Sequence, residues 1–144
     1  MSPDDQPDLQ RFLAAQESAG AYGRALAELE AGRKTSHWIW FVFPQIAGLG
    51  QSEMSRRFAI ASAAEARAYA AHPVLGARLR DCCSALLRHR DRSAEEILGG
   101  IDAVKLRSSM TLFARAAPAE PLFAEVLDAF YGGAGDPATE ARLG

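Results

Sequence analysis

The side chains best suited to chemistry begin in a short polar segment that precedes the most apolar run of the sequence. Lys34, Ser36 and His37 lie directly before a run that contains Trp38 and Trp40. A lysine and a histidine beside aromatic faces suit a planar or phosphorylated small molecule. The structural alternative is that Ser36 caps a helix, His37 bonds a backbone carbonyl and the tryptophans belong to the core.

A second polar group occurs later in the chain and includes Asp102, Lys105, Ser108 and Ser109. Lys105 and Ser109 have the i, i+4 spacing that places two side chains on one face of a helix. Asp102 is one turn before Lys105, so a local ion pair or a helix cap would explain both residues without any function.

Lysine is rare in this sequence, and both lysines belong to these groups. Of the 16 basic residues, all except Lys34 and Lys105 are arginines. A lysine carries a compact ammonium, whereas the guanidinium of arginine is larger, planar and forked. Two residues are few enough for chance, but in a binding domain we expect the two lysines to neutralise an anion. If the two groups form one site, they must meet in space. The candidate ligand-binding residues are Lys34, Ser36, His37, Trp38, Trp40, Gln45, Asp102, Lys105, Ser108 and Ser109.

Other common chemistries have no pattern here. His37, His72 and His89 are scattered, so no zinc-type spacing exists, and we expect no metal and no cofactor. Cys82 and Cys83 are adjacent, and on a helix their side chains diverge by about 100°. We expect two half-buried core thiols. No nucleophile elbow or P-loop is present, so a conventional hydrolase or kinase is not expected.

The composition predicts a single all-α domain of seven to nine helices. A length of 144 residues corresponds to about one domain. The sequence holds 29 alanines and only 12 β-branched residues, a ratio that favours helices over strands. We expect residues 1–7 to form a flexible N-terminus and residues 8–144 to form the compact domain.

Residues that start and stop helices mark the expected elements. Asp8 and Asp102 are expected to cap helices, and Gly32 to end one. Pro73 fits the first position of a helix, and Asp136 begins a terminal turn. Residues 38–43 could form a buried strand, but no other segment offers a partner strand. We therefore expect a short buried helix or turn there.

Net charge and hydropathy limit the classes of partner that the sequence is expected to have. The formal net charge is −2, so nucleic acid is not an expected partner. No apolar run approaches the roughly 18–20 residues that span a membrane. The first residues resemble no secretory signal, and we expect a cytoplasmic location. A locally basic strip consists of Arg78, Arg80, Arg88, Arg90 and Arg92.

Two long motifs resemble a known family. One is residues 32–45, and the other is Asp102 and Lys105-Leu106 followed by residues 108–113. Shorter matches lie between them, at Gly48-Leu49-Gly50 and His72-Pro73 among others. The sequence is identified as a member of the bacterial domain of unknown function family 1810, over residues 8 to 143. The resemblance implies a helical fold and no activity. A calpastatin-like label used for such proteins does not fit, because calpastatin-type inhibitors are largely disordered.

These observations lead to two functional hypotheses. The first is a domain that binds a small anionic, nucleotide-like molecule, with or without catalysis. The alternative is a non-catalytic protein-interaction module, in which the two groups serve packing and the arginine strip binds an acidic protein partner.

Overall fold

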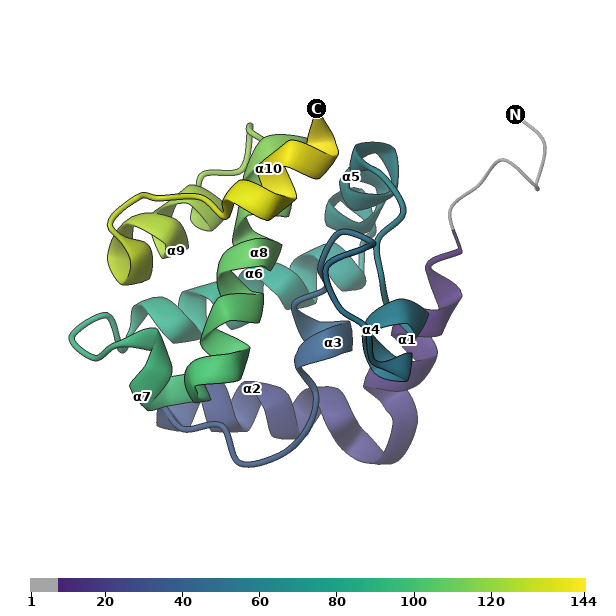
Figure 1. Ribbon diagram of the computed structural model, residues 1–144. Helices are drawn as coiled ribbons and strands as arrows, with labels where there is room; N and C mark the ends of the chain where they lie inside the picture. The colour runs from purple at the N-terminus through teal and green to yellow at the C-terminus, as the bar shows by residue number, and fades with distance from the viewer. Residues whose placement is uncertain (1–7) are drawn as a thin grey trace.

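The computed structural model describes residues 8–144 and consists of helices joined by short loops (Figure 1). The predicted flexible segment 1–7 lies outside the described residues. Nine α-helices of five or more residues and the single turn α3 are present in the described part, together with one 3₁₀ turn, and no strand is found there. The helices are α1 (Gln10–Glu17), α2 (Ala21–Ala31), α3 (Ile39–Val42), α4 (Glu53–Arg57), α5 (Ala63–Ala71), α6 (Leu75–Leu87), α7 (Ala94–Leu98), α8 (Gly100–Ala116), α9 (Leu122–Tyr131) and α10 (Pro137–Leu143), and the 3₁₀ turn is η2 (Ser18–Gly20). The prediction of one all-α domain is confirmed.

Helix α8 is the central element, and it packs against α3, α5, α7, α9 and α10 (Figure 1). Residues 108–113 of this helix are all buried, so this stretch is covered on every side. Its first half buries only one face, with Leu106 inward and Ile101 and Val104 exposed. Amphipathic helices bury one stripe in this way. The N-terminal half of α8 therefore reaches the surface.

The aromatic run folds as the sequence predicts, into a short buried helix. Helix α3 occupies Ile39–Val42, and the flanking Trp38 and Phe43 are almost fully buried. The amide of Phe43 donates to the carbonyl of Ile39 at 3.0 Å, which closes the turn. A run this apolar is stable only inside the core. It anchors the loop that precedes it.

Four helix boundaries differ from the sequence-based expectation. Helix α1 begins after Leu9 without a side-chain cap, so Asp8 does not cap it. Helix α6 begins at Leu75, where His72 rather than Pro73 organises the start, because its Nδ1 accepts from the amides of residues 74 and 75. Asp102 lies inside the first turn of α8 and forms ion pairs instead of a cap.

The C-terminal turn is the fourth difference. Residues 137–143 form helix α10, in which Asp136 accepts from the Thr139 amide at 3.0 Å and Thr139 is fully buried. The thiols of Cys82 and Cys83 are free and fully buried rather than half-buried. None of the helices described is long and apolar enough to cross a membrane.

Candidate functional site

The loop of residues 32–38 is held in shape by one carboxylate of helix α2. Glu28 accepts hydrogen bonds from the backbone amides of Thr35 (2.7 Å) and Ser36 (3.0 Å), and from the Ser36 hydroxyl. It also accepts from the indole Nε1 of Trp38 at 3.0 Å. Gly32 turns the chain out of α2 with φ of 75°, in the left-handed region that glycine favours. The loop is therefore fixed before any ligand binds.

The environment of Glu28 keeps it ionised. Burial alone would raise the pKa of this carboxyl, but the hydrogen bonds from Ser36, Thr35 and Trp38 together lower it from 4.5 to about 2. Donors that point at a carboxylate favour its charged form. Glu28 is thus an anion at all ordinary pH values.

The two lysines meet at a single carboxylate. Lys34 Nζ lies 2.7 Å from Asp102 Oδ2, and Lys105 Nζ lies 3.9 Å from Asp102 Oδ1. The side chains of Lys34, Asp102 and Lys105 are only 7%, 16% and 21% exposed, respectively. Backbone pairing supports the arrangement, because the Lys34 amide donates to the carbonyl of Ile97 at 2.8 Å. The two sequence segments therefore share one surface.

Each lysine also contacts a tryptophan ring. Lys34 Nζ lies 5.0 Å from the centre of the Trp38 ring, and Lys105 Nζ lies 5.0 Å from that of Trp40. Such cation–π contacts hold an ammonium over an aromatic face. The indole N–H of Trp40 is buried and has no hydrogen-bond partner in the protein.

A cleft of about 460 Å³ opens where these groups meet. The charged side chains that line it are two ammonium groups and one carboxylate, a formal charge of +1 for the lining without the nearby Glu28. The start of the 17-residue helix α8 forms one wall and has no side-chain cap, so its first amides add to the positive potential. The lining residues are Lys34, Thr35, Ser36, His37, Trp40, Leu98, Gly99, Gly100, Ile101, Asp102 and Lys105.

Four of the ten predicted site residues lie away from the cleft. Trp38 is core, with its N–H occupied by Glu28. Ser109 is fully buried and has no hydrogen-bond partner. Gln45 is partly buried outside the cleft lining, and its backbone carbonyl accepts from the Ile60 amide at 2.8 Å. Ser108 serves helix packing, because its hydroxyl lies 3.2 Å from Asp136 at the start of α10.

Sequence reasoning missed two contributors to the site. Glu28 lies in the last turn of α2, where an acidic side chain opposes the helix dipole and so needs donors of its own. That unfavourable placement was the available signal. The second contributor is the pair Gly99-Gly100, in which Gly99 is the N-cap of α8 and Gly100 its first residue.

The arginine strip is largely engaged within the chain. Arg78 pairs with Glu17 at 2.6 Å, and Arg92 donates to the carbonyl of Gly32 at 2.6 Å. Longer contacts join Arg80 to Glu120, at 3.8 Å, and Arg88 to Glu30, at 4.0 Å. Arg90 donates to the carbonyl of Leu87 at 3.0 Å. The strip offers an acidic partner fewer free donors than its sequence suggests.

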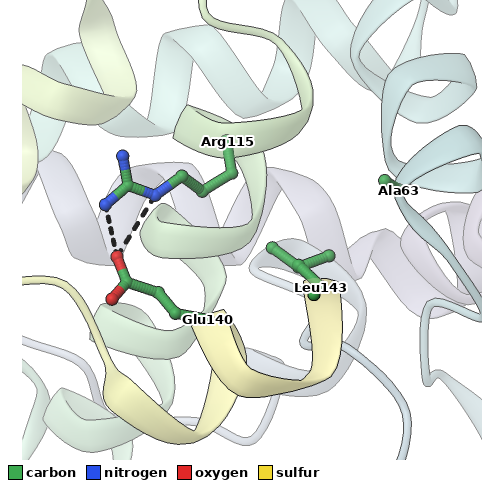
Figure 2. Close-up of a pocket in the computed structure, with 5 residues that line it drawn as sticks. Ala63, Arg115, Glu140 and Leu143 are labelled. Atoms are coloured by element: carbon green, nitrogen blue, oxygen red, sulfur yellow. Dashed lines mark hydrogen bonds and ion pairs between the residues drawn. The ribbon is translucent and has the colours of Figure 1, made fainter.

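A second depression lies between α8, α10 and the start of α5, and Figure 2 shows its side chains. Arg115 and Glu140 form an ion pair at one side of it, with Arg115 Nε 3.2 Å from Glu140 Oε1. Ala63 and Leu143 supply the apolar part of the lining. Because its two charges neutralise each other, this depression is a weaker candidate than the lysine cleft.

The comparisons with known proteins agree with this helical architecture. The model of the family described as "Protein of unknown function (DUF1810)" matches residues 6–143, and the chain belongs to this family. The chain is 49% identical to a conserved hypothetical protein from Mycobacterium tuberculosis whose crystal structure is known, with a TM-score of 0.91. That match covers 94% of this chain and 96% of the mycobacterial one. No curated protein matches the chain.

Proposed function

We propose that this protein binds a small anionic molecule in the cleft between the loop of residues 32–38 and the start of α8. The observation that carries the proposal is the convergence of Lys34 and Lys105, the two lysines of the sequence, on the single carboxylate of Asp102. The cleft lining carries one more cation than anion, and the charge of Glu28, which is not part of the lining, is already met by four hydrogen-bond donors. An anionic group would satisfy that excess.

The nature of the cleft supports a ligand of nucleotide size. Its volume of about 460 Å³ lies within the usual range of roughly 300–1,000 Å³ for small-molecule sites. His37 adds a polar group to the lining, and Trp40 adds an aromatic wall with an unpartnered N–H, whereas the donors of Ser36 are taken by Glu28. The proposal is one of binding, and catalysis is no part of it. We propose a cytoplasmic location, where the two buried free thiols would stay reduced.

The test is calorimetric titration with pyrophosphate, AMP and ADP-ribose, combined with two variants of opposite effect. Lys105→Gln removes one cation. It should lower the affinity for the most tightly bound of these anions about tenfold, as expected for a lost hydrogen bond to a charged group. Asp102→Asn removes the competing carboxylate and should strengthen binding of the same anion, although it lowers stability.

Arg88→Gln is the matched control, because it makes the same change of charge at an exposed side chain outside the cleft. It should leave affinity unchanged. Failure of all three anions to bind at millimolar concentration would refute the proposal. Equal affinities for wild type, Lys105→Gln and Asp102→Asn would place any bound anion elsewhere.

A further inference from the structure

One wall of the lysine cleft is apolar and faces water. Among residues 8–144 the exposed large hydrophobic side chains are Val74, Ile101 and Val104, at 38%, 76% and 62% exposure. Ile101 lines the cleft, and Val104 follows one turn later on the same face of α8. Single exposed apolar residues are ordinary, but neighbouring ones beside a pocket indicate a contact surface. The most exposed of the three therefore lies where a ligand would bind.

Gly100, next to Ile101 in the cleft, is not explained by the packing of the protein. Its φ lies outside the positive region, and a Cβ built on it would meet nothing within 4 Å. Its neighbour Gly99 differs, because a φ of 88° requires glycine there. Glycine also destabilises a helix relative to alanine. Because Gly100 lines the cleft and has no side chain, this part of the wall is open to another molecule.

We infer that the ligand of this cleft is an amphiphilic anion, a free small molecule with an apolar group beside its charge. The charged group would lie at Lys34 and Lys105, and the apolar group would lie over Gly100 against Ile101. The inference rests on the proposed function and deepens that function. It excludes inorganic anions and plain sugar phosphates as the preferred class of ligand. The inference commits to a free small molecule because the cleft volume of about 460 Å³ lies in the usual range for such ligands.

The experiment uses the aromatic sulfonate 1-anilinonaphthalene-8-sulfonate as an amphiphilic probe and pyrophosphate as an anion without an apolar part. The probe should fluoresce when it binds the wild-type protein, and pyrophosphate should displace it. Lys105→Gln should lower the affinity for the probe. Ile101→Ser should lower the affinity for the probe at least about fivefold, the loss expected for an aliphatic contact. The same variant should keep the affinity for pyrophosphate within about twofold of the wild-type value. Gly100→Ala should also weaken the probe while the melting temperature rises or stays constant.

Two control variants match these changes at places outside the cleft. Val74→Ser removes an exposed aliphatic side chain, and Gly23→Ala fills an open position in α2 where nothing lies within 4 Å. Both should leave the affinity for the probe unchanged.

The outcomes separate the inference from the proposed function. If pyrophosphate binds and Lys105→Gln weakens it, but Ile101→Ser and Gly100→Ala leave the probe unaffected, the inference is overturned and the proposed function stands. If neither pyrophosphate nor the probe binds, both fail. A dimer in light scattering that Ile101→Ser converts to monomer, with no displacement of the probe by pyrophosphate, would assign the apolar wall to self-association and overturn the inference.

Discussion

Glu28 shows how a single residue positions the candidate site without touching a ligand. Its carboxylate accepts from two backbone amides, a hydroxyl and an indole, and these donors come from the loop that carries Lys34 and His37. A glutamine at this position keeps one acceptor oxygen and loses the charge. We predict that Glu28→Gln lowers the free energy of unfolding by about 1–3 kcal/mol.

Urea denaturation measures this loss. Glu30→Gln on the same helix is the control, because the Glu30 side chain is exposed and its ion pair with Arg88 is long, at 4.0 Å. The control should change stability by less than about 0.5 kcal/mol. Equal effects of the two variants would contradict the role assigned to Glu28.

The lowered pKa of Glu28 also predicts a dependence on pH. A carboxyl whose pKa falls on folding stabilises the folded state above its unfolded pKa and loses that contribution on protonation. With values of 4.5 unfolded and about 2 folded, the contribution is complete above pH 4.5 and falls as the pH approaches 2. Between pH 6 and pH 3 the wild type should therefore lose more stability than Glu28→Gln does, as measured by thermal denaturation. Parallel losses in the two proteins would count against this origin of the shift.

At the residue scale, the composition singles out the two lysines but does not predict which side chains they contact. Lys34 and Lys105 stand out because the chain otherwise uses arginine. Trp38 and Trp40 are indistinguishable in sequence, yet Trp38 bonds Glu28 inside the core and Trp40 lines the cleft. Which of two neighbouring tryptophans faces outward depends on the orientation of a single helical turn, and that orientation is set by packing.

At the scale of elements, helix α10 depends on one aspartate. Asp136 accepts from the amide and hydroxyl of Thr139 and from the hydroxyl of Ser108 on α8. We predict that Asp136→Ala costs about 1–2 kcal/mol of stability, as for other lost N-caps, and speeds hydrogen exchange in residues 137–143. Asp128→Ala, at an exposed position of α9, is the control. Unchanged exchange in α10 would show that other contacts hold this helix.

Elements with an apolar stripe were predictable, and those fixed by polar contacts were not. Leu75, Leu79, Cys82 and Leu86 are spaced as the buried face of α6 and are all buried. Helix α10 instead buries Thr139 and is held by hydrogen bonds between Asp136 and the hydroxyls of Ser108 and Thr111 on α8. Without an apolar stripe, its sequence resembles that of a turn. The sequence likewise favours Asp102 as a cap, because the true N-cap and first residue of α8 are Gly99 and Gly100, which give no helix-propensity signal.

At the scale of the whole molecule, the core around α8 is continuous with the candidate site. Phe113 is fully buried, with ring centres 5.3 Å from Tyr69 and 5.6 Å from Phe123. Phe113→Ala should cost about 3–5 kcal/mol, a large part of the roughly 5–15 kcal/mol that stabilises such a domain. Ile101→Ala, on the exposed end of the same helix, should change stability by less than about 0.5 kcal/mol. Chemical denaturation compares the two, and similar losses would contradict the assignment of Ile101 to a free surface.

The fold class followed from composition, whereas the meeting of the two polar segments required tertiary structure. Alanine content and helix stop signals predict helices one at a time, and they leave open which helix faces which. The loop of residues 32–38 reaches α8 because α3 is drawn into the core beside it and because Lys34 pairs with both Ile97 and Asp102. Such long-range contacts leave no periodic pattern in the sequence.

The most direct test of anion binding in the lysine cleft is a titration of ¹⁵N-labelled protein with pyrophosphate, followed by nuclear magnetic resonance. The two tryptophan indole signals are internal reporters, because Trp38 donates to Glu28 and Trp40 has no partner in the protein. We predict that the Trp40 indole and the amides of Gly99 and Gly100 shift together in a saturable way, while the Trp38 indole stays in place. Shifts confined to other parts of the surface, or no saturable shift at all, would contradict an anion site between Lys34 and Lys105.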